Sequence, residues 1–152
     1  MTESATARYA MGYDDRERRR LQLQASIINP VTEQLLRRAG LRAGMRVLDV
    51  GSGVGDVAML AARIVGSTGS VTACDLDETA LAVLQERAAS EGLTNISTLA
   101  GDLHALDVPD DIDAVTGRHI LIHVPDPLAI VRLVAGLVKP GGVVVFQEYD
   151  FS

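Results

Sequence analysis

Three glycines at alternate positions, Gly51, Gly53 and Gly55, lie between the short apolar run Arg46–Val50 and a second apolar run at 57–65. Glycine inside a regular element costs roughly 0.5–1 kcal/mol relative to alanine, so a cluster of three requires a compensating reason. The usual reason is a ligand that approaches the backbone. Because the second run has helical character, the sequence predicts a strand, a tight turn at a ligand site, and a helix.

The remainder of the chain continues this alternation. Strands are expected at 70–74, 96–99, 112–116 and 143–147, and helices at 78–91 and 127–138. The last helix has Asp126 as its predicted N-cap, Pro127 at its first position, and Pro140-Gly141-Gly142 as its stop signal. Crossovers of this length, with strands apolar on both faces, predict an α/β Rossmann-like fold: a three-layer sandwich with a mostly parallel sheet.

The segment before this alternation, at 14–40, is charged and favours helix. Asn29-Pro30 interrupts it, and the residue before a proline is pushed out of the helical region, so two helices are predicted there. We therefore divide the chain into an N-terminal helical cap segment, 1–40, and a core, 41–152.

Charge and cysteine content exclude several classes of function. The chain has 152 residues and a formal net charge of -6, which argues against a nucleic-acid partner. Cys74 is the single cysteine, so the sequence predicts no disulfide, no metal centre and a reducing, cytoplasmic location. No apolar stretch reaches the roughly 20 residues of a membrane span, and no signal peptide is recognisable, so no membrane association is expected.

The spacing of the glycines distinguishes between cofactors. In the dinucleotide fingerprint G-x-G-x-x-G the third glycine comes one residue later, where this chain has Asp56, which disfavours a nicotinamide or flavin. The segment from Asp49 to Gly55 instead resembles, without substitution, the acidic-x-G-x-G-x-G signature of the class I S-adenosylmethionine-dependent methyltransferases. The resemblance covers nearly everything after Gly40, and the pattern Tyr9, Gly12, Gln24 is similar to a small-molecule branch of that family.

The resemblance implies a sheet order of 3-2-1-4-5 and S-adenosyl-L-methionine as cofactor, with S-adenosyl-L-homocysteine as product. Asp75, 20 residues beyond Gly55, would accept hydrogen bonds from the ribose hydroxyls, and Leu76 would lie against the adenine. Asp49 would hold the glycine turn or reach the ligand's ammonium group through water. The implied cofactor-binding residues are Asp49, Gly51, Ser52, Gly53, Gly55, Asp75, Leu76, Gly101, Asp102, Leu103 and Arg118.

Within that set, Asp102 would accept from the adenine amino group while the Leu103 amide faces the ring. Each motif also has a purely structural interpretation: a glycine loop, an ordinary turn at Gly101, or Asp75 in the N-cap region of the next helix. Three ligand-type sequences after three successive strands, at the edge where this architecture binds ligands, favour the cofactor site.

Methyl transfer needs alignment of the reacting atoms and exclusion of water, and a base only for some acceptors. His119 and His123 follow the fourth strand and are the candidate catalytic residues, although His123 has the alternative of fixing the turn before Asp126. His104 is predicted at the surface. Cys74 is predicted to be a core residue.

The preferred function is therefore methylation of an oxygen, nitrogen or carbon atom of a small molecule. The alternatives are a non-catalytic cofactor-binding fragment or subunit of the same fold and, less favoured, a nicotinamide-dependent reductase. Family members continue past the fifth strand, so the core is expected to be incomplete at its C-terminus. The outer edge of that strand is then expected to be exposed, so either the chain is a fragment of a longer protein, or it completes its fold by association, with a homo-oligomer as one form of that association.

Overall fold

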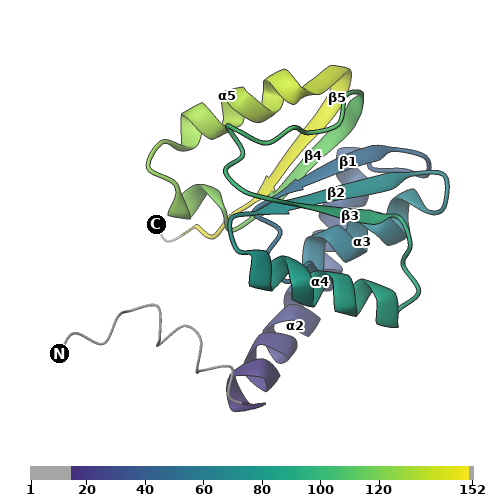
Figure 1. Cartoon of the computed structure of the whole chain (residues 1–152), viewed down its shortest axis with the longest axis vertical. Coiled ribbons are helices and arrows are strands. Elements are labelled where there is room, and N and C mark those ends of the chain that lie inside the picture. The colour runs from purple at the N-terminus through teal and green to yellow at the C-terminus, as the bar shows by residue number, and fades with distance from the viewer. Residues whose placement is uncertain (1–14, 151–152) are drawn as a thin grey trace.

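A five-stranded parallel sheet forms the centre of the protein in the computed structural model, which describes residues 15–150 (Figure 1). Its order is β3-β2-β1-β4-β5, which confirms the predicted topology. The strands are β1 (Arg46–Val50), β2 (Ser70–Asp75), β3 (Ile96–Ala100), β4 (Ile112–Arg118) and β5 (Val138–Gln147). All neighbouring strands are parallel, so their carboxyl ends meet at one edge of the sheet.

Helices cover both faces of the sheet. One core cluster joins the sheet to α2 (Asp15–Ala39), α3 (Asp56–Val65) and α4 (Glu78–Ser90), and the other joins it to α5 (Pro127–Leu137). Strand β1 contributes to both clusters, because Val47 points to the first and Leu48 to the second. The three layers of the predicted sandwich are therefore present.

The helix starts follow from their capping residues. Asp126 caps α5, as predicted, because its carboxylate accepts from the Ala129 backbone N–H at 3.0 Å. Asp77 caps α4 and accepts from the N–H groups of Thr79 and Ala80. The cap of α4 is thus Asp77 and not Asp75, which leaves Asp75 available for another role.

The prediction of two helices in 14–40 was wrong, because α2 runs through Pro30 as one helix within the described residues. A proline removes one backbone hydrogen bond, but tertiary packing outweighs that local loss here. Beyond Pro30, the Thr32 and Leu36 side chains are only 2% exposed, and the Thr32 hydroxyl donates to the Ile28 carbonyl at 3.2 Å. The predicted roles of Tyr9 and Gly12 lie outside the described residues.

The start of the fifth strand also differs from the prediction. We expected Pro140-Gly141-Gly142 to separate α5 from a strand at 143–147, whereas β5 begins at Val138 and includes these residues. Ile112 pairs with Val138 and Ala114 with Val143, so the intervening residues of β5 bulge out of register. Asp113 stabilises the bulge, because its carboxylate binds the Lys139 ammonium at 2.6 Å and accepts from the Arg46 backbone N–H at 2.8 Å.

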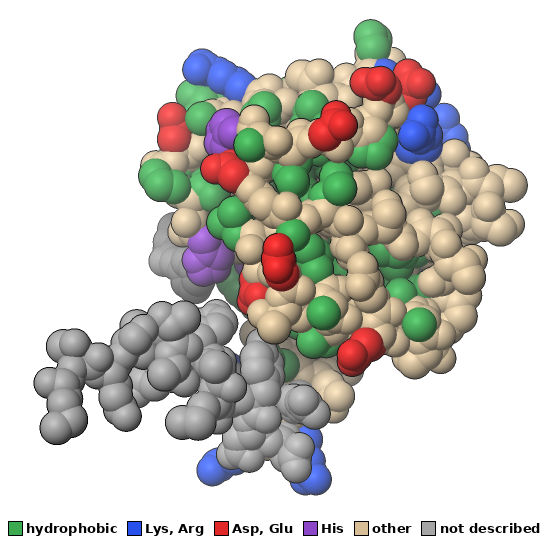
Figure 2. Space-filling view, in the orientation of Figure 1, with side chains coloured by type: hydrophobic (Ala, Val, Ile, Leu, Met, Phe, Trp, Pro, Cys, Tyr) green, Lys and Arg blue, Asp and Glu red, His purple; other side chains and the backbone are tan. Residues whose placement is uncertain are grey.

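Cys74 is a core residue, as predicted, with 2% of its surface exposed. Among residues 15–150, no helix is long and apolar enough to cross a membrane, and no group of histidine, cysteine or acidic side chains could hold a metal ion. In the view of Figure 2, acidic side chains are spread over the surface, while lysine and arginine side chains lie at its margins.

Candidate functional site

The glycine turn joins β1 to α3 at the carboxyl edge of the sheet, as predicted. Gly53 has φ +53°, and a Cβ atom built on it would meet no described atom within 4 Å. Gly55 has φ +95° and is packed: a Cβ atom there would lie 2.4 Å from Leu84 Cγ. Of the three glycines in the turn, Gly55 is therefore required by the packing of α4, while Gly53 keeps an open surface in front of the backbone.

Asp75, at the end of β2, holds the turn in place. Its Oδ2 accepts from the Gly53 backbone N–H at 2.8 Å, and its Oδ1 accepts from the Asp77 N–H at 2.9 Å. A carboxylate has about four lone-pair sites, so these two bonds leave acceptor capacity on both oxygens. Asp75 can therefore support the turn and still accept from a diol.

Asp49 is a buried carboxyl group behind the turn, with 1% of its surface exposed. Its Oδ1 accepts from the Thr116 hydroxyl at 2.8 Å, whereas its Oδ2 has no hydrogen-bond partner among residues 15–150. Burial raises the pKa of Asp49 to about 7, opposed by the Thr116 hydrogen bond and by the charge of Arg118. A buried carboxyl with one unsatisfied oxygen suits a positively charged group of a ligand.

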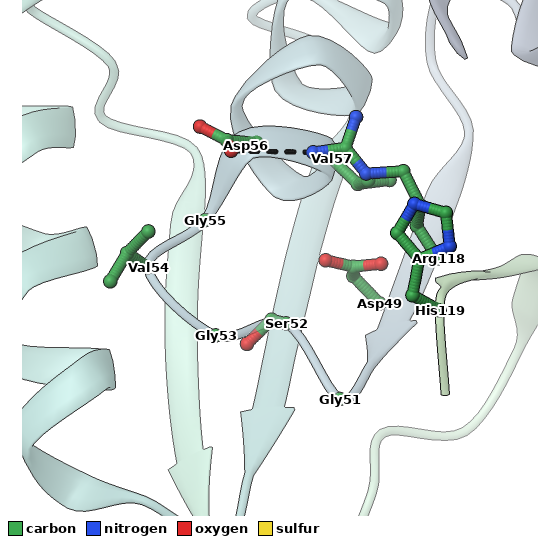
Figure 3. A pocket seen from close by; sticks show the side chains of 10 residues that line it. All are labelled: Asp49, Gly51, Ser52, Gly53, Val54, Gly55, Asp56, Val57, Arg118 and His119. Carbon is green, nitrogen blue, oxygen red and sulfur yellow. Dashed lines mark hydrogen bonds and ion pairs between the residues drawn. The ribbon is translucent and has the colours of Figure 1, made fainter. Parts of the chain in front are cut away.

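A pocket of about 210 Å³ opens in front of the turn (Figure 3). It brings together seven of the predicted site residues and three of their neighbours. The lining consists of Asp49, Gly51, Ser52, Gly53, Val54, Gly55, Asp56, Val57, Arg118 and His119. The Ser52 hydroxyl is also buried without a partner in the part of the chain that the structure describes.

The other predicted residues lie at the neighbouring strand ends, outside this pocket. Leu76 is 77% exposed directly after β2, and the Gly101 N–H donates to the Asp75 carbonyl at 3.0 Å. The Asp102 side chain is 65% exposed and accepts from the backbone N–H and the ring of His104, which lowers the pKa of Asp102. Leu103 packs against the core cluster under α5. These residues therefore follow β2 and β3 at the carboxyl edge of the sheet, where the glycine turn also lies.

The two candidate catalytic histidines are placed differently. His119 lines the pocket with φ +55°, and neither of its ring nitrogens has a hydrogen-bond partner among the described residues. Burial, helped by the charge of Arg118, lowers the pKa of His119. His123 ends the 3-10 helix η1 (Leu121–His123), is exposed and does not line the pocket. His104 is exposed, as predicted.

Sequence reasoning missed the residues that hold His119 and its loop. The ring of Tyr149 stacks on that of His119, with centroids 3.9 Å apart and planes 5° from parallel. Glu148 Oε1 accepts from the backbone N–H groups of Ile120 at 3.1 Å and Leu121 at 3.0 Å. Their position in the sequence could have indicated them, because Glu148 and Tyr149 directly follow β5. In sheets of this kind, ligand sites lie at the carboxyl ends of the strands.

Comparison with known proteins adds three findings. A family model described as a methyltransferase domain matches residues 41–151. A demethylmenaquinone methyltransferase of Staphylococcus aureus is 38% identical over 117 residues, which are 76% of this chain and 48% of the relative. A ubiquinone biosynthesis O-methyltransferase of Albidiferax ferrireducens is 40% identical over 127 residues, 82% of this chain and 49% of the relative. The chain thus spans about half the length of these curated relatives.

A solved structure supports the same grouping. The crystal structure of a SAM dependent methyltransferase from Aquifex aeolicus superposes with a TM-score of 0.69 at 27% sequence identity. The superposition covers 80% of this chain and 68% of the Aquifex chain. The matched family segment begins directly before β1 and therefore contains the whole sheet and the pocket, while α2 precedes it.

Proposed function

Because the chain belongs to the class I S-adenosylmethionine-dependent methyltransferases, we propose that it transfers a methyl group to an oxygen, nitrogen or carbon atom of a small molecule. The observation that carries the proposal is the open backbone at Gly53, with the buried carboxyl of Asp49 behind it and Asp75 beside it. S-adenosyl-L-methionine supplies the methyl group as part of a sulfonium cation.

The described residues fit this cofactor. The unsatisfied Oδ2 of Asp49 and the open face of the turn suit the cationic methionine portion. The spare acceptor sites of Asp75 suit the ribose hydroxyls, and the exposed side chain of Leu76 offers an apolar surface to the adenine. We therefore propose the sequence-derived set as the cofactor contacts: Asp49, Gly51, Ser52, Gly53, Gly55, Asp75, Leu76, Gly101, Asp102 and Leu103, with Arg118 bordering the pocket.

His119 is the better placed of the two candidate bases. It stands at the pocket wall, its ring is stacked on Tyr149, and burial lowers its pKa, which favours the neutral form that a proton acceptor needs. We propose that His119 accepts a proton from an acceptor hydroxyl or activated carbon, while the walls of the pocket exclude water. His123 remains a second candidate base, further from the pocket along η1.

Acceptor identity is proposed from the relatives. The two curated relatives are named for demethylmenaquinone and for ubiquinone biosynthesis, so a hydroxylated quinone-type ring is the first acceptor class to test. The alternative, a cofactor-binding unit without its own turnover, draws support from the chain spanning about half the length of these relatives. The match to a methyltransferase family disfavours the third candidate, a nicotinamide-dependent reductase.

A partner at the sheet edge is also proposed. Among residues 15–150, β5 pairs with β4 on one side, and no described strand pairs with its outer edge. Backbone groups on such an edge recruit another strand, so we propose that further residues or a second copy of the chain pair there. Light scattering on the purified chain, combined with size exclusion, distinguishes a monomer from a dimer.

Calorimetric titration with S-adenosylmethionine, S-adenosylhomocysteine and NADH tests the cofactor. We expect the first two to bind and NADH not to bind, and tighter binding of NADH would overturn the proposal. Turnover of radiolabelled cofactor against a panel of quinols, phenols and amines then separates an enzyme from a cofactor-binding unit.

A matched pair of glycine variants tests the place of binding. Gly53→Val should abolish S-adenosylhomocysteine binding, because the branched side chain would fill the space in front of the turn. Gly66→Val is the control: Gly66 also has a left-handed φ, +66°, and open space, but it follows α3 at the helix end away from the turn. Equal affinities of the two variants would show that the ligand binds elsewhere.

A further inference from the structure

We propose that Arg118 is a positioning residue that ties helix α2 to the glycine turn, so that α2 forms part of the cofactor site. This inference rests on the proposed function for its ligand and on the contacts below for its geometry. It gives Arg118 a role other than direct contact with the cofactor. It also assigns a role to α2, which lies before the matched family segment of residues 41–151.

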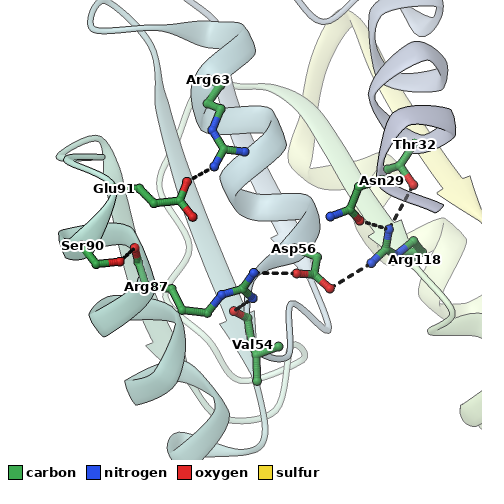
Figure 4. A network of polar contacts seen from close by, with 9 residues as sticks. All are labelled: Asn29, Thr32, Val54, Asp56, Arg63, Arg87, Ser90, Glu91 and Arg118. Atoms are coloured by element: carbon green, nitrogen blue, oxygen red, sulfur yellow. Dashed lines mark hydrogen bonds and ion pairs between the residues drawn. The ribbon is translucent and has the colours of Figure 1, made fainter. Parts of the chain in front are cut away.

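Arg118 comes from the end of β4, and only 12% of its side chain is exposed. Its NH1 group donates to Asn29 Oδ1 at 2.9 Å and to Thr32 Oγ1 at 3.0 Å. Both acceptors belong to α2, and Figure 4 shows them facing Arg118; in the sequence they lie on either side of Pro30. The guanidinium therefore binds α2 on both sides of Pro30, the residue whose missing N–H costs the helix one backbone hydrogen bond.

The second nitrogen of the same guanidinium points toward the turn. NH2 donates to Asp56 Oδ2 at 3.3 Å, and Asp56 is the first residue of α3, directly after Gly55. Asp56 Oδ1 accepts from Arg87 of α4 at 2.9 Å, and Arg87 NH1 donates to the carbonyl of Val54 at 2.7 Å. The dashed lines in Figure 4 trace this path from α2 through Arg118, Asp56 and Arg87 to the backbone of the turn.

Asp56 is partly buried between two arginine side chains, so its contacts matter for the local balance of charge. The side chain of Asp56 is 22% exposed and pairs with two guanidinium groups, so its removal would leave two like charges near each other without the carboxylate between them. The Thr32 hydroxyl lies 2.6 Å from Gln147 Oε1, which connects the same cluster to the end of β5. Strand ends β4 and β5, helix α2 and the turn are thus held by one set of side chains.

The planar guanidinium is required for this arrangement. One nitrogen serves two acceptors on α2 while the other serves Asp56, and the fixed fork sets the distance between helix and turn. A lysine at position 118 would keep the positive charge near Asp49, but its single ammonium group could not reach both the acceptors on α2 and Asp56. Arg118→Lys therefore separates the effect of charge from the effect of bridging.

Hydrogen exchange measured by mass spectrometry, with and without S-adenosylhomocysteine, tests the proposal on the whole chain. We expect the ligand to slow exchange in residues 28–36 of the parent protein, because it fixes the turn and the turn is tied to α2. In Arg118→Met and Arg118→Lys we expect faster exchange of residues 28–36 without ligand, with unchanged exchange in β1 and β2. We also expect loss of the ligand-induced slowing and roughly tenfold weaker binding.

Arg63→Met is the matched control. Arg63 is also an arginine paired with a carboxylate, Glu91, but in the described structure its side chain makes no hydrogen bond to Arg118, Asp56 or Arg87, so α2 exchange and ligand affinity should stay at parent values. A second variant, Asn29→Ala, removes one partner on α2 and should reproduce the faster exchange of residues 28–36 while leaving Arg118 in place.

Three results would overturn the proposal. Unchanged α2 exchange in ligand-free Arg118→Met would show that the bridge does not hold the helix. Weak binding by Arg118→Met but parent-like binding by Arg118→Lys would show that its charge acts on the ligand directly. Parent-like protection of α2 by ligand in Arg118→Met would show that turn and helix are not coupled. If the parent protein binds no S-adenosylhomocysteine, the proposed function fails, and the ligand-free exchange still decides whether Arg118 holds α2.

Discussion

The candidate site has two sides that differ in how the fold holds them. On the glycine-turn side, which comprises residues 49–57 with Arg118 and His119, contacts within the protein hold the side chains in place. There, Asp49 is 1% exposed, Gly55 packs on Leu84, and Arg118 is bound from two directions. On the outer side, which comprises Leu76 and residues 101–103, Leu76 is 77% exposed and the Asp102 carboxylate contacts only His104 in the described structure. The turn side is therefore preorganised by the fold, whereas the outer side is left open to solvent.

The largest expected effect is on the turn side and on stability. Gly55→Val would place a Cβ atom 2.4 Å from Leu84 Cγ at a residue with φ +95°. Overpacking and backbone strain together should lower the free energy of unfolding by about 2–5 kcal/mol, measured by urea denaturation. Gly92→Val, at φ +69° with no described atom within 4 Å, carries the strain alone and should lose about 1–2 kcal/mol. Equal losses would show that Leu84 does not restrict the turn.

Asp75 sits where the two sides meet, and its loss should mainly weaken binding. Asp75→Ala removes the acceptor of the Gly53 N–H and the proposed acceptor of the ribose hydroxyls. We expect about ten- to a hundredfold weaker binding of S-adenosylhomocysteine by calorimetry. Asp77→Ala, two residues further on, removes only the cap of α4 and should lower stability by about 1 kcal/mol while affinity changes little. A similar loss of affinity in both variants would mean that Asp75 acts only through the fold.

The pKa of Asp49 predicts a pH dependence confined to the turn side. The carboxyl has its ordinary pKa of 3.8 in the unfolded chain and about 7 in the folded protein, so the folded state binds more protons between these values. Stability from this group is therefore full at low pH and falls as the pH rises from about 4 to about 7. Asp49→Asn should remove that fall when urea unfolding is compared at pH 5 and pH 8.

The same titration should affect the ligand in the opposite direction. A cationic ligand favours the ionised carboxylate, so affinity for S-adenosylmethionine should rise by up to about tenfold per pH unit below pH 7 and then level off. Calorimetry between pH 5.5 and pH 8.5 measures this rise. A pH profile that Asp49→Asn leaves unchanged would assign it to another group.

The smallest effect is expected on the outer side. Asp102→Ala removes an exposed carboxylate that folding does not require, so binding of S-adenosylhomocysteine should weaken only about two- to tenfold. An analogue with hypoxanthine in place of adenine lacks the amino group and sharpens the test. The parent protein should bind it more weakly than S-adenosylhomocysteine, while Asp102→Ala should bind both alike if Asp102 reads that group.

The sequence predicted those features that depend on neighbours in the chain. The start and end of β1, the cap at Asp126 and the turn at 51–55 follow from local patterns, and parallel crossovers place the strand ends together. Long-range contacts were not predictable in this way. Asn29 meets Arg118 across 89 residues of sequence, and α2 continues through Pro30 because Thr32 and Leu36 are buried against the rest of the fold.

In the candidate site, too, the sequence predicted what depends on local patterns and missed the long-range contacts. The predicted residues of the turn side lie together in one pocket, and those of the outer side lie on adjacent strand ends, which parallel register requires. Neither the stack of Tyr149 on His119 nor the hydrogen bonds of Glu148 leaves a local pattern, because both join β5 to the loop after β4. Their position directly after a strand was the only signal.

Cys74 makes the native chain a convenient background for spectroscopic labelling. It is the sole thiol of the sequence, and burial raises its pKa to about 12, so we expect it to react slowly with alkylating reagents while the protein is folded. A cysteine introduced at an exposed position of α2, such as Ile27→Cys, would therefore react alone. A fluorophore or spin label attached there could report whether a ligand changes the surroundings of α2, without first removing any natural cysteine.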